Sequence, residues 1–147
     1  MDYLDVFNET LKELFEDNGL NKLRFQKSTG ISAHTVWGWE SKKYYPAPKT
    51  VMKIADYFKC SSDYLFGLTE KREGFVPKEN RIEFIFLFDK LEKENNLNDN
   101  RIAKFCNIGN AAVAKWRRFR RLPTTEILLK LTELFHCSLE YLLGRED

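Results

Sequence analysis

Residues 20–41 read LNKLRFQKSTGISAHTVWGWES, and residues 97–118 read LNDNRIAKFCNIGNAAVAKWRR, which follows the same pattern 77 residues later. The same shift aligns Phe7–Gly67 with Phe84–Gly144 without a gap, and 18 of the 61 aligned positions are identical. Most of the identical residues are apolar or turn-forming, so the two stretches are expected to share one core. The sequence therefore predicts two copies of one folding unit.

Apolar spacing and turn residues divide the first copy into five short helices. We expect them at about 4–17, 22–29, 33–41, 49–58 and 61–66. Asn21 and Ser32 are placed to cap the second and third helices, because a short polar side chain accepts a hydrogen bond from free N–H groups of the first turn. Pro46 breaks the chain before the fourth helix, Ser61 starts the fifth, and Gly67 closes it.

The second copy follows the same plan. The predicted fold class is therefore all-α, with two tandem five-helix domains, one at residues 1–69 and one at residues 81–147. Residues 70–80, which include Gly74 and Pro77, are expected to be a linker.

The composition excludes several function classes. Hydrophobic residues make up 43% of the chain and charged residues 31%, as in soluble globular proteins. The longest apolar run, Phe84–Phe88, is too short to cross a bilayer, and the acidic N-terminus does not resemble a secretory signal. Cys60, Cys106 and Cys137 contain no C-x-x-C pair, which argues against a disulfide framework or a zinc site. With no catalytic or phosphate-loop pattern at workable spacing, we expect a cytoplasmic protein that is not an enzyme.

Positive charge is concentrated in the same part of both copies. From Leu20 to Lys53 there are seven Lys or Arg and one acidic residue, and from Leu97 to Lys130 there are eight and two, so each segment carries +6. The whole chain carries only +2, which leaves −10 for the remainder. A basic surface binds nucleic acid because neutralised phosphates release condensed counterions. The charge pattern therefore favours nucleic acid as a partner.

An ordered set of short motifs runs through both copies. The first copy contains LNK at 20–22, GIS at 30–32, WE at 39–40, Pro46 and SSDYLFG at 61–67; the second contains KWRR at 115–118, LP at 122–123 and CSLEYLLG at 137–144. With these motifs the chain resembles the lambda-repressor-like helix-turn-helix family, also called the Xre family. The second copy resembles the phage-repressor branch of that family. The resemblance covers residues 4–69 and 81–145.

The resemblance implies that the second and third helices of each copy form a helix-turn-helix and that the third helix enters the major groove of double-stranded DNA. The implied function is sequence-specific transcriptional regulation, with repression expected, in a protein of phage or mobile-element type. Such a protein is bacterial or phage-encoded and nucleoid-associated. No cofactor, metal or membrane partner is expected, and no small-molecule ligand is evident from the sequence.

In the first copy, Val36 and Trp39 are expected to face the core, which leaves the rest of the third helix, Gly38 included, toward solvent or DNA. The family pattern places base contacts at the start of this helix. The base-reading residues predicted here are Ser32, Ala33, His34, Thr35 and Trp37. The predicted phosphate contacts are Lys22, Lys42 and Lys43.

In the second copy, Asn110 is suited to adenine and Lys115 to guanine. The predicted base-reading residues of this copy are Asn110, Ala111, Ala112 and Lys115, and its predicted phosphate contacts are Arg117, Arg118, Arg120 and Arg121. Asp99 stands where the first copy has Lys22, and an acid there is expected to repel phosphate.

The first helix of the second copy carries extra apolar residues where the first copy has polar ones. These residues are Ile82, Ile85, Phe86 and Leu87. Such a face is expected to pack against the first copy or the linker, or to form a homodimer interface. The alternative function is accordingly a protein-interaction module of antitoxin or anti-repressor type, in which the second copy serves dimerisation. The sequence leaves monomer and homodimer open.

Overall fold

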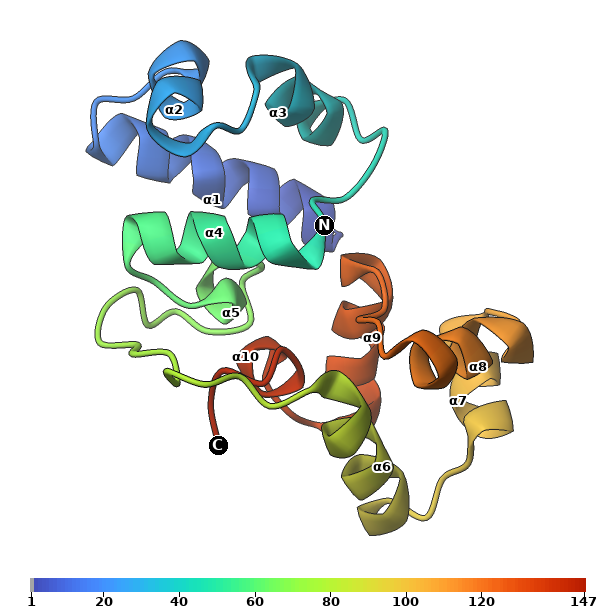
Figure 1. Cartoon of the computed structure of the whole chain (residues 1–147). Coiled ribbons are helices and arrows are strands. Elements are labelled where there is room, and N and C mark those ends of the chain that lie inside the picture. The colour runs from blue at the N-terminus through green and yellow to red at the C-terminus, as the bar shows by residue number, and fades with distance from the viewer. Residues whose placement is uncertain (1) are drawn as a thin grey trace. The chain divides into compact units, whose positions relative to one another are not determined.

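The computed structural model describes residues 2–147, and within this range the chain forms helices and loops with no strand (Figure 1). The predicted all-α class is confirmed. The chain divides into two compact units, unit 1 (Met1–Val76) and unit 2 (Pro77–Asp147). None of the helices described is long and apolar enough to cross a membrane.

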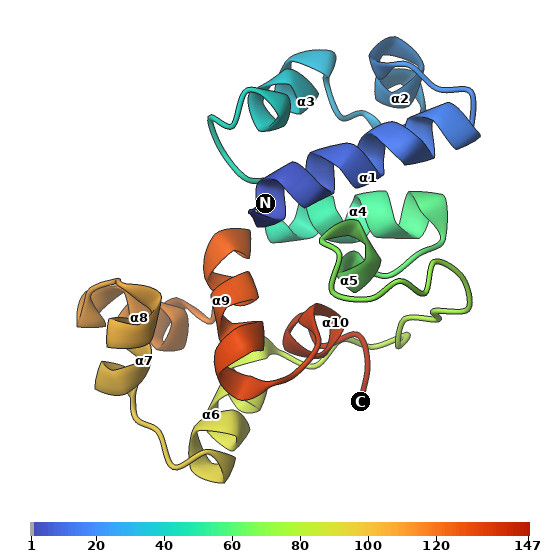
Figure 2. The same cartoon turned by 180° about the vertical axis from the view of Figure 1, so that it is seen from behind.

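Unit 1 contains five helices, and their ends lie close to those expected from the sequence. They are α1 (Tyr3–Asp17), α2 (Lys22–Thr29), α3 (Ala33–Glu40), α4 (Pro48–Phe58) and α5 (Ser62–Leu65). In both views α1 lies between the α2–α3 pair and α4 (Figures 1 and 2). The turn from α2 to α3 is short, and Gly30 within it has a φ of 79°, a left-handed conformation that favours glycine.

The predicted caps of unit 1 are confirmed. The Asn21 side chain accepts a hydrogen bond from the backbone N–H of Arg24 at 2.8 Å. Ser32 accepts one from the N–H of Thr35 at 3.0 Å. The hydroxyl of Ser61 likewise caps the first turn of α5. These bonds satisfy N–H groups that have no partner inside the helix and fix where each helix begins.

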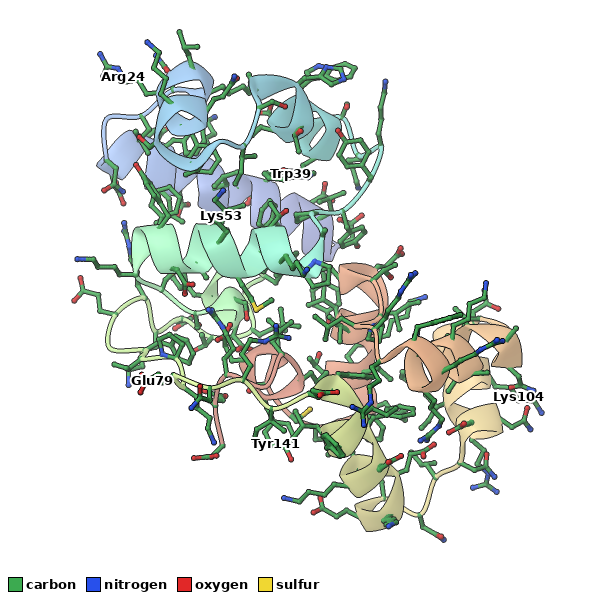
Figure 3. All side chains as sticks on the ribbon, viewed as in Figure 1. Arg24, Trp39, Lys53, Glu79, Lys104 and Tyr141 are labelled. Atoms are coloured by element: carbon green, nitrogen blue, oxygen red, sulfur yellow. The ribbon has the colours of Figure 1, made fainter. Side chains whose placement is uncertain are left out.

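Aromatic residues from α1 and α3 form the centre of the unit 1 core. Phe7 meets the edge of Trp39 with ring centroids 5.4 Å apart and stacks on Phe66 at 5.0 Å. Trp39 is turned inward toward α1, whereas Arg24 projects outward from α2 (Figure 3). This contact fixes α3 on α1 and decides which face of α3 remains exposed.

Unit 2 contains five helices in the same order. They are α6 (Phe84–Glu94), α7 (Asp99–Cys106), α8 (Asn110–Phe119), α9 (Thr125–Phe135) and α10 (Leu139–Leu142). Phe84 and Phe88 both meet the edge of Trp116, at 6.0 and 5.6 Å. Phe84 and Trp116 are the residues aligned with Phe7 and Trp39, so the same aromatic contact holds the third helix on the first in both units.

The segment before α6 is extended rather than helical. The backbone N–H of Lys78 donates to the carbonyl of Arg145 at 2.8 Å, and that of Ile82 donates to the carbonyl of Gly144 at 3.0 Å. Ile82 therefore does not belong to the first helix of unit 2, where the sequence placed it. The backbone bond to Gly144 holds this stretch against the end of the chain instead.

Candidate nucleic-acid interface

The exposed face of α3 carries an aromatic pair. His34 is exposed and the Trp37 side chain is 45% exposed, and their rings stack at 5.8 Å with 23° between the planes. The ammonium group of Lys43 lies 4.4 Å from the centroid of the Trp37 ring. Val36 and Trp39 are buried on the opposite face, as predicted. α3 therefore exposes two aromatic rings, and the loop that follows it places a cation over one of them.

The start of α3 is held by polar contacts that also involve predicted base-reading residues. The hydroxyls of Ser32 and Thr35 lie 2.8 Å apart, and both side chains are half-buried. The N–H of Ala33, also half-buried, donates to the Oε1 atom of Gln26 at 3.1 Å. Gln26 was not singled out from the sequence, although its position on the last turn of α2 places it opposite the first turn of α3.

Gly38 is buried, so the expectation that it faces solvent is wrong. The Tyr44 side chain, which follows α3, covers it: a Cβ added to Gly38 would lie 2.1 Å from the Tyr44 hydroxyl oxygen. Glycine at this position makes room for a ring that returns from the loop after the helix.

The predicted phosphate contacts of unit 1 lie on the surface, and two of them form ion pairs. Lys22 contacts Glu40 at 2.8 Å, and each side chain is nearly half exposed. Lys42 contacts Asp2 at 2.6 Å and Asp5 at 3.1 Å, and the hydrogen bond to Asp2 raises the Lys42 pKa. Exposed pairs of this kind contribute little free energy, so they do not prevent either lysine from contacting another anion.

Residues 10–71 match the family model of the Cro/C1-type HTH DNA-binding domain. Unit 1 contains a Cro/C1-type HTH domain. The matched range lies entirely in unit 1 and includes α2 and α3. The family resemblance predicted for residues 81–145 stays a prediction.

A regulator of known class is similar to part of the chain. The HTH-type transcriptional regulator ImmR of Bacillus subtilis (strain 168) is 42% identical over 45 residues. That stretch is 31% of this chain and 35% of ImmR, so the match spans about a third of the relative's length. No solved structure matches the chain.

The corresponding face of unit 2 has a different composition from that of the Cro/C1-type domain. Asn110, Ala111 and Lys115 are exposed on α8 and Ala112 is half-buried. The Asn110 amide donates to Asn100 Oδ1 at 3.4 Å. This face carries an amide, a cation and methyl groups, where α3 carries two aromatic rings.

Three of the predicted arginines of unit 2 surround exposed phenylalanines. The guanidinium carbons of Arg118 and Arg121 each lie 5.3 Å from the Phe119 ring centroid, and Phe119 is 50% exposed. Arg120 lies 5.6 Å from the ring of Phe86 and 3.6 Å from a carboxylate oxygen of Glu83. All three guanidinium groups remain on the surface, where phosphate can reach them.

Arg117 was also predicted to contact phosphate, but its surroundings differ from those of the three surface arginines. Its guanidinium is half-buried among a carboxylate cluster consisting of Asp89, Glu92 and Asp99. It donates two hydrogen bonds to Asp99, at 3.0 and 2.8 Å, and one to Glu92 at 2.6 Å. These contacts raise the Arg117 pKa, foremost through Asp99. A guanidinium surrounded by three carboxylates is already neutralised and has little to offer a phosphate.

The contact with Arg117 also explains why unit 2 has an acidic residue, Asp99, where unit 1 has Lys22. Asp99 and Arg117 are aligned with Lys22 and Glu40 of unit 1, which form an ion pair of opposite polarity. Each unit therefore joins the first turn of its second helix to the third helix by an ion pair, with the charges reversed in unit 2. Asp99 serves this packing contact within the unit.

The carboxylate cluster predicts a stability that depends on pH. The pKa of Glu92 is raised to about 7, chiefly because burial penalises the charged carboxylate; the hydrogen bond and charge of Asp99 also raise it, and Arg117 lowers it. Because this pKa is raised on folding, the folded chain keeps a proton that the unfolded chain loses above about pH 4.5. The free energy of unfolding of unit 2 is therefore expected to fall between about pH 4.5 and 7, by roughly 1–3 kcal/mol. The pKa of Asp99 is lowered, so this group changes the free energy of unfolding only in more acidic solution.

Urea unfolding followed at the indole N–H resonance of Trp116 measures this dependence at pH 5 and pH 8. In Glu92→Gln the side chain is neutral at both pH values. The urea midpoint of this variant should therefore fall much less between pH 5 and pH 8 than that of the wild type. Glu94→Gln removes an exposed carboxyl of the same helix, and its midpoint should fall between pH 5 and pH 8 as much as that of the wild type. Equal pH dependence in all three proteins would contradict the assignment to Glu92.

The predicted interface on α6 is only partly exposed. Leu87 is 6% exposed and belongs to the core, so its assignment to an outer face is wrong. Leu87 lies three residues after Phe84 and four before Leu91, so it shares the buried face of α6 with them. Phe86 is 56% exposed, and Ile85 and Ile82 are half-buried.

Proposed function

We propose that the chain is a sequence-specific double-stranded DNA-binding transcriptional regulator that represses by occupying a promoter. In this proposal α3 enters the major groove, where His34 and Trp37 meet base edges and Lys22, Lys42 and Lys43 contact phosphates. The observation that carries the proposal is the exposed His34–Trp37 pair on the third helix of a Cro/C1-type HTH domain. The name of ImmR, an HTH-type transcriptional regulator, supports the regulatory role.

We further propose that unit 2 is a second copy of the domain and adds its own DNA contacts. The matching helix order, the repeated contact between Phe84 and Trp116, and the charge-reversed ion pair support a common origin. Asn110 and Lys115 would read bases, and Arg118, Arg120 and Arg121 would contact phosphates. The two reading faces differ, so a single chain would prefer an asymmetric site.

Gel-shift titrations of genomic fragments at two salt concentrations test this proposal. The wild-type chain should prefer some fragments, and its affinity should fall as salt rises. Arg118→Ala should weaken binding to all fragments alike and reduce the slope of log affinity against log salt by about 1. Arg72→Ala is the matched control, since Arg72 pairs with Asp17 of α1 and belongs to neither α3 nor α8. Binding without fragment preference would contradict the proposal.

The second candidate is a protein-interaction module in which unit 2 forms a homodimer and leaves DNA to unit 1. The exposed Phe86 favours it, because large exposed apolar side chains often mark interfaces. The two candidates differ in the same titrations: in the second, Arg118→Ala leaves DNA affinity unchanged. The second also requires that the mass from light scattering fall to that of a monomer when Phe86 is replaced by serine.

A further inference from the structure

Unit 1 contains a cavity of about 470 Å³ between α1, the start of α2 and α3. Leu11 and Val36 form its apolar floor and are almost fully buried. Phe15 and Leu23 form its walls, and Leu23 is 57% exposed. A volume of this size lies in the range of ordinary small-molecule sites. The cavity was not apparent from the sequence.

The aligned position in unit 2 also has a hollow, of about 710 Å³, but Asp89, Glu92 and Asp99 line it. There the guanidinium of Arg117 lies 5.2 Å from the centroid of the Phe88 ring and is bound by the carboxylate cluster. Phe88 and Arg117 are aligned with Leu11 and Glu40 of unit 1. A charged group on an apolar floor, neutralised from the rim, is therefore already accommodated by this fold.

The rim of the unit 1 cavity has the opposite charge. Lys12 and Lys22 stand where unit 2 has Asp89 and Asp99, and both line the cavity. The one acid on the rim, Glu40, pairs with Lys22 at 2.8 Å, so the rim as a whole retains a positive charge beside Lys12. An anionic group of a ligand would therefore be favoured at the rim, and an apolar group would be favoured against the floor and walls.

A buried acceptor lies beside the same cavity. Asn8 donates from Nδ2 to the carbonyl of Trp39 at 2.9 Å, while its Oδ1 is buried and no donor among residues 2–147 reaches it. An unsatisfied buried acceptor is costly, so a donor brought close by a ligand would be favoured. A nitrogen-containing ring offers such a donor.

We propose that this cavity binds a small aromatic carboxylate. The ring lies against Leu11, Phe15 and Leu23, and the carboxylate lies beside Lys12 at the rim. The site does not include His34 or Trp37, and Lys22 is the residue that it shares with the proposed DNA contacts.

Titration of the full-length ¹⁵N-labelled chain with indole-3-acetate tests the proposal, and indole-3-acetamide is the neutral probe of the same shape. Saturable shifts are expected at the amides of residues lining the cavity, with indole-3-acetamide binding roughly three- to fivefold more weakly. Leu23→Asn, which introduces the residue found at the aligned position of unit 2, removes an apolar wall. It should weaken indole-3-acetate roughly tenfold.

The rim charge is tested by Lys12→Met, which should weaken indole-3-acetate about as much as the acetamide substitution does. Lys49→Met removes the same charge from an exposed site outside the cavity and should leave the affinity unchanged. All of these are surface changes, and the amide spectrum reports whether each variant is folded. Shifts spread over the basic surface, equal binding of the two probes, or equal effects of Lys12→Met and Lys49→Met would overturn the proposal.

Discussion

Gly144→Ala is expected to unfold unit 2. Gly144 has a φ of 75°, and a Cβ at this position would lie 2.0 Å from the backbone oxygen of Ile82. This oxygen belongs to the backbone and cannot rotate aside as a side chain can, and the N–H of the same residue is bonded to the Gly144 carbonyl, so the extended segment must separate from the end of the chain. We expect a loss of more than about 4 kcal/mol, a large part of the roughly 4–10 kcal/mol that stabilises a domain of this size.

The aligned glycine of unit 1 supplies the control. Gly67 has nearly the same φ, 74°, but its added Cβ would meet a side-chain methyl group of Val6 at 2.7 Å. Gly67→Ala should therefore cost only about 1–2 kcal/mol, from backbone strain and movement of Val6. The indole resonances of Trp39 and Trp116 report the two units separately during urea unfolding. If Gly144→Ala leaves the Trp116 transition within 1 kcal/mol of wild type, roughly the scatter of such extrapolations, the close contact is not as described.

Arg145→Met is expected to destabilise unit 2 by about 3–5 kcal/mol. Arg145 pairs with Glu140 through two hydrogen bonds, at 3.0 and 3.1 Å, and the two side chains are 5% and 0% exposed. Removing the guanidinium leaves a carboxylate inside the core without its counter-charge. The measurement is the urea midpoint at neutral pH.

The double variant Glu140→Gln with Arg145→Met separates charge burial from packing. It removes both charges, so it should recover a large part of the lost stability. A double variant no more stable than Arg145→Met would mean that the arginine stabilises unit 2 through packing alone.

Features set by short-range chemistry could be predicted from the sequence. Asn21 and Ser32 cap the helices they were expected to cap, because an N-cap depends only on a short polar side chain and the N–H groups two or three residues later. Val36 and Trp39 could be assigned to the core because their spacing places them on one face of a short helix. The exposed position of His34 and Trp37 follows from the same spacing.

Features set by contacts between helices could not be predicted in this way. Arg117 was predicted to contact phosphate because it lies in a cluster of basic residues. Only the packing of α6 and α7 against α8 brings three carboxylates to it. Gly38 is covered by Tyr44, whose position depends on the path of the following loop. The burial of Leu87, by contrast, follows from helical spacing, because it lies three residues after Phe84 and four before Leu91.

We propose that α3 reads DNA bases through His34 and Trp37. The base preference of variants at these two positions tests this proposal most directly. Duplexes selected by the wild-type chain from a random pool should be bound again by His34→Ala and Trp37→Ala, but with preference lost at one or two base pairs, at about 1–3 kcal/mol for each lost contact. Lys43→Ala should instead weaken all duplexes alike. If both α3 variants keep the wild-type preference at every position, α3 of unit 1 does not read DNA.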